Sequence, residues 1–151
     1  MLALDAVLVK MAEEASEVAD EATLIVKLAC KTIRFGTDSY HPRDPEQRSN
    51  QTKLLEGMVR LEQELDDLRV AYLLFMYQQF QFSTEESEVG VIIENWFTNE
   101  DERLEALRRL TKFDRLLLAT KEKGSISDGE LEKLQTLIMN VMNHLRLMGE
   151  T

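Results

Sequence analysis

Residues 4–33 decide the fold class of this 151-residue chain, and they read LDAVLVKMAEEASEVADEATLIVKLACKTI. Apolar residues recur in this stretch at alternating spacings of four and three, which is the period of one face of an α-helix. The stripe consists of Leu4, Leu8, Met11, Ala15, Val18, Ala22, Ile25 and Ala29. Gly36 follows as a helix stop. The sequence therefore predicts one long helix from about Leu4 to Ile33.

A polar loop and a second long helix are predicted next. Residues 37–50 hold both prolines of the chain together with several Asp and Ser residues, a composition typical of a loop. A second apolar stripe predicts a helix from Gln51 to about Phe82. This stripe consists of Leu54, Met58, Leu61, Leu65, Leu68, Tyr72 and Phe75.

Three shorter helices are predicted in the remainder of the chain. Residues 83–86 match a capping box that opens a helix from Glu85 to Phe97. The apolar run inside this segment is also compatible with a strand, but no other strand is predicted with which it could pair. Asn99 and Ser127 cap the last two helices. The apolar stripe of the last helix consists of Leu131, Leu134, Ile138, Val141, Met142 and Leu145. We expect a single all-α domain over residues 1–151, a bundle of about five helices.

The composition restricts the compartment and the partners. A net charge of −10 argues against non-specific binding to nucleic acids, which requires a basic surface. The apolar residues 1–9 are too few, and interrupted by Asp5, to be a signal peptide or a membrane span. The single cysteine, Cys30, cannot form an intramolecular disulfide, which fits a reducing compartment. We expect a soluble, cytoplasmic protein that contacts neither nucleic acid nor membrane.

Two pairs of carboxylates form the candidate site. Glu14 and Glu17 are three residues apart on the first predicted helix, and Glu64 and Asp67 repeat that spacing on the second. The members of each pair lie side by side on their helix, and all four precede a residue of the apolar stripe. If the two stripes pack together, the four carboxylates meet at one rim of the interface. Like charges gathered there would need a divalent cation between them.

A simpler interpretation is that these residues belong to two solvated helix faces. Glu13, Asp20 and Glu21 fit that interpretation well. Two observations favour a metal site instead. The two pairs have the same position relative to the apolar stripes, and few basic residues, chiefly Lys10 and Arg60, lie on the same sides of the two predicted helices. The pattern alone leaves both interpretations open.

The motifs also resemble those of a known family, the all-α nucleoside triphosphate pyrophosphohydrolases, and within it the MazG-like branch. The family pattern E-E-x-x-E occurs at residues 13–17, K-x-x-R-F-G at residues 31–36, and E-x-x-D at residues 64–67. The resemblance covers residues 10–75. Residues 83–151 carry no family motif, and a role in oligomerisation is one expectation for them.

The resemblance implies a role for each matched acidic residue. Glu14, Glu17, Glu64 and Asp67 correspond to the carboxylates that bind Mg²⁺ in the family, with Mn²⁺ as a substitute. Glu13 completes the first motif and corresponds to a residue that orients a water or a ligand near the reacting phosphate.

The same resemblance implies contacts with the substrate for Lys31, Arg34 and Asn50. Lys31 and Arg34 correspond to basic residues near the triphosphate, although cations at the end of a helix also complement its dipole. Asn50 corresponds to a substrate contact or serves as an N-cap. The two histidines, His41 and His144, are interpreted as surface or structural residues.

The function implied by the resemblance is Mg²⁺-dependent cleavage of a nucleoside triphosphate at its α–β bond, which yields the monophosphate and pyrophosphate. Family members form homodimers or homotetramers. One alternative is a non-catalytic helical interaction module that retains the fold. A third possibility, a di-iron helical bundle, is disfavoured because neither motif has the Glu-x-x-His spacing of such bundles.

Overall fold

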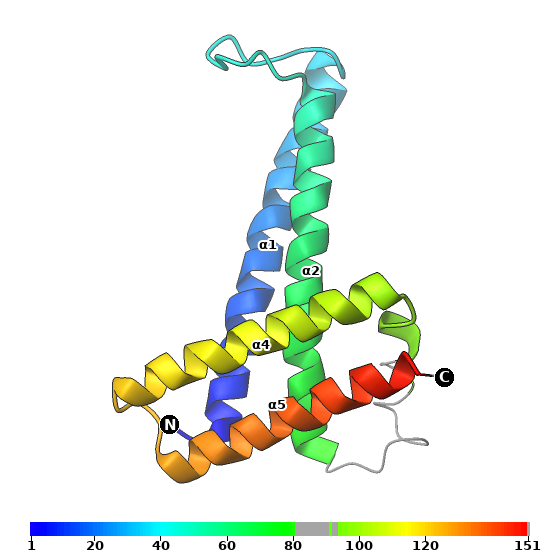
Figure 1. The fold of residues 1–151 in the computed structure, drawn as a ribbon. Helices are drawn as coiled ribbons and strands as arrows, with labels where there is room; N and C mark the ends of the chain where they lie inside the picture. The colour runs from blue at the N-terminus through cyan, green and yellow to red at the C-terminus, as the bar shows by residue number, and fades with distance from the viewer. Residues whose placement is uncertain (81–90, 92–93, 151) are drawn as a thin grey trace. The chain divides into compact units, whose positions relative to one another are not determined.

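The computed structural model describes residues 1–80, 91 and 94–150. Helix α1 spans Ala3–Phe35, α2 spans Asn50–Phe80, α4 spans Glu100–Glu122 and α5 spans Asp128–Met148 (Figure 1). No strand occurs among the residues that the model describes. The prediction of an all-α fold with two long helices is confirmed.

Part of the expected secondary structure lies outside the described residues. This applies to the capping box at residues 83–86, to most of the helix expected from Glu85 to Phe97, and to the expected end of the second helix at Phe82. Val91 and residues 94–96, which are described, have helical backbone.

The ends of the helices follow from the residues that stand there. Asn99 Oδ1 accepts a hydrogen bond from the Asp101 N–H at 2.8 Å, and Ser127 Oγ accepts one from the Glu130 N–H at 3.3 Å. Each bond satisfies an N–H group in the first turn of α4 or α5 that has no partner within the helix. Gly36 ends α1 with a φ of 91°, a left-handed conformation that a Cβ atom would disfavour. The predicted caps and the predicted stop are confirmed.

The chain forms two compact units. One comprises Met1–Ala12 and Asp67–Thr151, and the other comprises Glu13–Asp66. Helices α1 and α2 continue from one unit into the other without a break. The sequence does not signal this division, and the single domain over residues 1–151 stays a prediction.

The unit of Met1–Ala12 and Asp67–Thr151 contains the hydrophobic core. Helix α5 lies beside α4 (Figure 1), and it buries its whole predicted stripe: Leu131, Leu134, Ile138, Val141, Met142 and Leu145. Helix α4 buries Ala106, Leu110, Phe113 and Leu117. In α2, six of the eight residues from Val70 to Tyr77 are buried, so this part of α2 is enclosed around most of its circumference.

Polar contacts also connect helices of this unit. The Ala3 N–H, at the start of α1, donates to Glu130 Oε2 of α5 at 2.8 Å. The Tyr77 hydroxyl of α2 and His144 Nδ1 of α5 share a hydrogen bond. The interpretation of His144 as a structural residue agrees with this contact.

The buried face of helix α1 is not the face that carries the predicted stripe. Ala3, Ala6 and Val7 are buried, whereas Leu8 is 38% exposed and Ala15 is also exposed. The predicted stripe is therefore wrong by about one residue in the N-terminal half of the helix. The predicted stripe keeps one helical phase along all of α1, whereas residues 3–12 and 13–35 of the helix belong to different units.

The unit of Glu13–Asp66 is a helical hairpin in which α1 and α2 are joined by residues 36–49. The two helices approach closely at Gly57, where an added Cβ would lie 3.4 Å from Ile25 Cγ1. Arg60 Nε donates to Glu21 Oε2 at 3.1 Å and so connects the helices by an ion pair.

Polar contacts organise the loop of this hairpin. Asp44 accepts a hydrogen bond from Lys53 Nζ at 3.1 Å, which holds the pKa of the Asp44 carboxyl below its usual value. Asn50 is buried at the first position of α2, and its Nδ2 donates to the Gly36 carbonyl oxygen at 3.1 Å. The loop is thus closed by its own side chains.

Candidate metal centre

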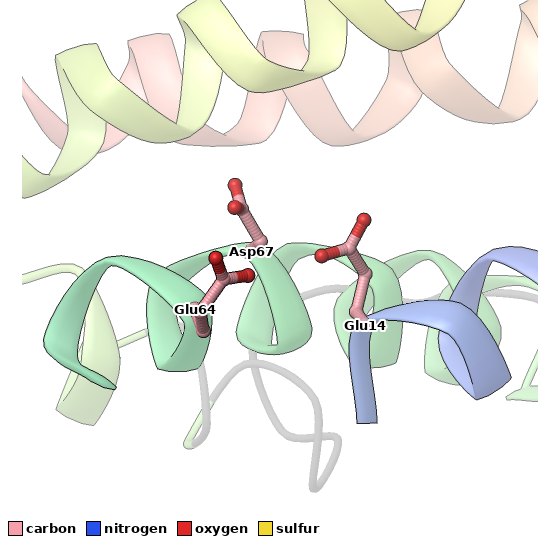
Figure 2. Close-up of side chains that lie close together, drawn as sticks. All are labelled: Glu14, Glu64 and Asp67. Carbon is pink, nitrogen blue, oxygen red and sulfur yellow. The ribbon is translucent and has the colours of Figure 1, made fainter. Parts of the chain in front are cut away.

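Three of the four predicted metal ligands lie together. One carboxylate oxygen each from Glu14, Glu64 and Asp67 forms a group in which all three atoms are within 4.8 Å of one another. Figure 2 shows Glu14 projecting from α1 towards the segment of α2 that carries Glu64 and Asp67. Glu64 and Asp67 are adjacent because α2 is continuous there and they are three residues apart.

The burial of this group is unusual for acidic side chains. Glu14 is only 5% exposed, and both Glu64 and Asp67 are partly buried. Carboxylates rarely become so buried unless they are paired or bind a metal, because removal of the charge from water is costly. Three of them close together add mutual repulsion, which a cation would offset.

The chemistry of these side chains fits a hard divalent cation. All three supply oxygen atoms, the ligands that Mg²⁺ and Mn²⁺ prefer over nitrogen and sulfur. A cation that binds oxygens at about 2.1 Å spans about 4.2 Å between opposite ligands. Small side-chain rotations within the 4.8 Å group would therefore be enough to complete a site.

Two basic side chains lie on the helices around this group. Arg109 of α4 donates from Nε to Asp67 Oδ1 at 2.5 Å, and Arg109 is itself mostly buried. Lys10 precedes Glu14 by one turn of α1, and its Nζ lies 5.5 Å from the centroid of the Phe113 ring. Sequence reasoning noticed Lys10 but missed Arg109, because no local pattern relates α4 to a residue 42 positions earlier.

The other two acidic residues of the first motif lie outside the group. Glu17 is exposed and is not among the carboxylates that gather with Glu14 in the described part of the chain. Glu13 is exposed as well. Glu17 has the same i, i+3 spacing from Glu14 that places Glu64 beside Asp67, but of the pair in α1 only the Glu14 side chain is buried.

The predicted substrate contacts lie at the far end of the hairpin from Glu14. Lys31 and Arg34 follow Glu14 by 17 and 20 residues on the continuous helix α1, about 25 and 30 Å at 1.5 Å per residue. Both are exposed, and the Arg34 guanidinium lies 5.1 Å from the centroid of the Phe35 ring. Asn50 closes the loop beside Gly36. Within one chain these three residues do not share a site with Glu14.

Aromatic side chains, which could stack on a nucleotide base, lie both in the core and at the surface of the described part of the chain. Tyr72 and Trp96 contact each other with tilted rings, their centroids 5.6 Å apart, and pack against the hydrophobic core, and Phe97 is buried. Phe35 and Tyr40 are exposed.

Comparison with known proteins adds no relative. No family model matches this chain, and no curated protein sequence or solved structure shows significant similarity to it. Within the described residues, no helix combines the length and the hydrophobicity needed to cross a membrane. The structure thus provides an all-α fold and a group of three carboxylates that could hold a metal ion.

Proposed function

We propose that this protein is a cytoplasmic, Mg²⁺-dependent nucleoside triphosphate pyrophosphohydrolase of the MazG-like type. The observation that carries the proposal is the convergence of Glu14, Glu64 and Asp67. These residues come from the two motifs, E-E-x-x-E and E-x-x-D, that resemble the family. The resemblance implies that residues of these two motifs meet around a metal ion, so their proximity supports the proposal.

The chemistry follows from the acidic side chains. Glu14, Glu64 and Asp67 would hold one or more Mg²⁺ or Mn²⁺ ions, which when bound bridge phosphate oxygens and lower the pKa of an attacking water. Glu13 is exposed next to Glu14 and would orient that water. Glu17 lies one turn beyond Glu14 and would need a change of rotamer to join the ligands.

A second copy of the chain is the proposed partner, in a homodimer or a homotetramer. None of the apolar residues from Glu13 to Asp66 is buried, and every residue of that range is described. Large hydrophobic side chains are instead exposed on both helices of the hairpin: Leu24, Val26, Ile33, Phe35, Leu55, Met58 and Val59. A pair of such hairpins would bury these side chains in a four-helix bundle. Lys31, Arg34 and Asn50 would then act on the substrate from the second copy.

Release of pyrophosphate tests the enzymatic proposal. The purified protein is incubated with a panel of canonical and modified nucleoside triphosphates and Mg²⁺, and pyrophosphate and monophosphate are quantified. We expect turnover by the wild type and by Glu62→Gln, a control on the exposed side of α2, and a loss of at least about 100-fold for Glu64→Gln. Equal activity of the two variants would contradict the assignment.

The alternative is a non-catalytic helical interaction module. The exposed apolar side chains of the hairpin are compatible with it, because such side chains indicate a protein partner whether or not the protein is an enzyme. Sedimentation of the wild type and of Met58→Glu measures the assembly independently of activity. A wild-type oligomer that Met58→Glu dissociates, together with no turnover of any nucleotide, would favour the module over the enzyme.

A further inference from the structure

Arg109 contacts the carboxylate group at Asp67, and it comes from the half of the chain that has no family motif. Its guanidinium lies against Asp67, with Nε 2.5 Å from Oδ1. The side chain of Arg109 is 13% exposed and that of Asp67 is 35% exposed. A guanidinium held at this distance in a partly buried place neutralises much of the charge on Asp67.

A second carboxylate holds the other side of the guanidinium. Arg109 Nη1 lies 3.4 Å from Glu105 Oε2, one turn earlier on α4. Glu105 also accepts two hydrogen bonds from Arg108, at 2.9 and 3.1 Å, and these lower the pKa of its carboxyl. Glu105 therefore stays ionised at neutral pH and would retain Arg109 if the contact with Asp67 were lost.

A divalent cation and Arg109 cannot both make full use of Asp67. The guanidinium contacts Asp67 Oδ1, a metal ion would bind an oxygen of the same carboxylate, and the two positive charges repel each other at short range. Entry of a cation would thus push the guanidinium away from Asp67. The displaced group would be left near the cation with strong donors, in a geometry that matches phosphate oxygens.

We propose that Arg109 is an exchangeable counter-ion of the carboxylate group: it competes with the divalent cation for Asp67, and once displaced it binds a phosphate of the nucleotide. The first half of this inference concerns metal binding alone, and the second half rests on the proposed function. Removal of the Arg109 charge should therefore strengthen the binding of the metal ion and weaken the binding of the nucleotide. A merely structural role of Arg109 would not produce this combination.

The first experiment measures Mn²⁺ binding by calorimetry, without nucleotide. Arg109→Met keeps an unbranched apolar stem and removes the charge, and it should bind Mn²⁺ about tenfold more tightly than the wild type because the competing cation is gone. Arg108→Met is the matched control: it removes the same charge from the neighbouring position of α4, where the ion pair with Glu105 is exposed. We expect the control to bind Mn²⁺ only slightly more tightly than the wild type, because Arg108 is exposed and contributes only a minor electrostatic interaction with Asp67.

The second experiment measures steady-state kinetics on a nucleotide that the wild type hydrolyses. Arg109→Met should raise KM at least about tenfold, with a smaller effect on kcat, because a phosphate contact is lost. Arg109→Lys should restore part of the loss in KM, since it keeps the charge without the planar fork. Arg108→Met should again behave like the wild type.

The outcomes separate this inference from the proposed function. Equal Mn²⁺ affinity of the wild type, Arg109→Met and Arg108→Met would overturn the competition, even if the enzyme is active. An unchanged KM in Arg109→Met would overturn the phosphate contact alone. Tighter Mn²⁺ binding by Arg109→Met in a protein that hydrolyses no nucleotide would support the competition, while the phosphate contact would fall with the proposed function. A lack of Mn²⁺ binding by all variants would overturn both.

Discussion

At the level of single residues, the Glu14 carboxylate is 5% exposed and lies close to those of Glu64 and Asp67. In millimolar Mg²⁺, Glu14→Gln should lower the free energy of unfolding by on the order of 1 kcal/mol, because one ligand of the ion loses its charge. Urea denaturation measures this change. Glu13→Gln, at the exposed neighbouring position, is the control and should have no such effect. Equal stability of the two variants in Mg²⁺ would contradict the role of Glu14 as a ligand.

His144 makes the stability of the fold depend on pH. Burial lowers the pKa of this imidazole from its usual value of 6.5, and the Glu94 carboxylate offsets part of that effect. The unfolded chain therefore binds a proton more readily than the folded one, so stability is lost as the pH falls below about 6.5.

The substitution His144→Gln should remove this dependence, because glutamine keeps a hydrogen-bonding group near Tyr77 and does not titrate. Thermal melts between pH 7.5 and 5 give the comparison: the gap in melting temperature between wild type and variant should narrow on acidification. A gap that stays constant over this range would show that His144 does not contribute to the pH dependence.

At the level of elements, the contact between α1 and α5 depends on the ionised form of Glu130. The Ala3 N–H, followed by Lys133, lowers the pKa of the Glu130 carboxyl from its usual value of 4.5. The stabilisation is thus present above about pH 4.5 and is lost as the pH falls through the lowered value. Glu130→Gln should be less stable than Glu132→Gln, an exposed control on α5, at pH 7 and equally stable at pH 3. A difference that persists at pH 3 would contradict the role of the charge.

Two glycines of the hairpin should respond to alanine in opposite ways. Gly57 lies within α2, and a Cβ there meets Ile25 at 3.4 Å, an ordinary contact, so Gly57→Ala should stabilise the protein by about 0.5–1 kcal/mol through helix propensity. Gly36 has a φ of 91°, so Gly36→Ala should destabilise it by about 1 kcal/mol. Equilibrium unfolding of both variants measures the two effects. The same sign for both would argue against this description of the hairpin.

Local signals were sufficient to predict the described helices, but they predicted the buried face correctly for α5 and not for α1. Asn99, Ser127 and Gly36 act within a few residues of themselves, and each was identified correctly. The stripe of α5 was predicted in full because one side of that helix packs along its whole length. The stripe of α1 was wrong at Leu8 because the buried face of a helix depends on what surrounds it, which periodicity alone does not contain.

At the level of the whole molecule, the candidate site joins residues whose proximity is set by the fold. Glu14 and Glu64 were predicted to meet through a shared motif spacing, and they do. The ion pair of Arg109 with Asp67 depends on how α4 packs, so no sequence pattern could reveal it. The sequence likewise does not predict that apolar side chains of the hairpin are exposed. An apolar stripe has the same pattern whether it packs within one chain or against another.

The central claim is that Glu14, Glu64 and Asp67 form a binding site for a divalent cation, and a magnesium titration followed by thermal unfolding tests it most directly. A ligand at 100 times its dissociation constant stabilises a protein by about 2.7 kcal/mol, or roughly 5–10 °C in melting temperature for a chain of this size. We predict such a rise for the wild type and for Glu62→Gln, and none for Glu64→Gln. A wild-type melting temperature that does not change across millimolar Mg²⁺ would contradict the claim.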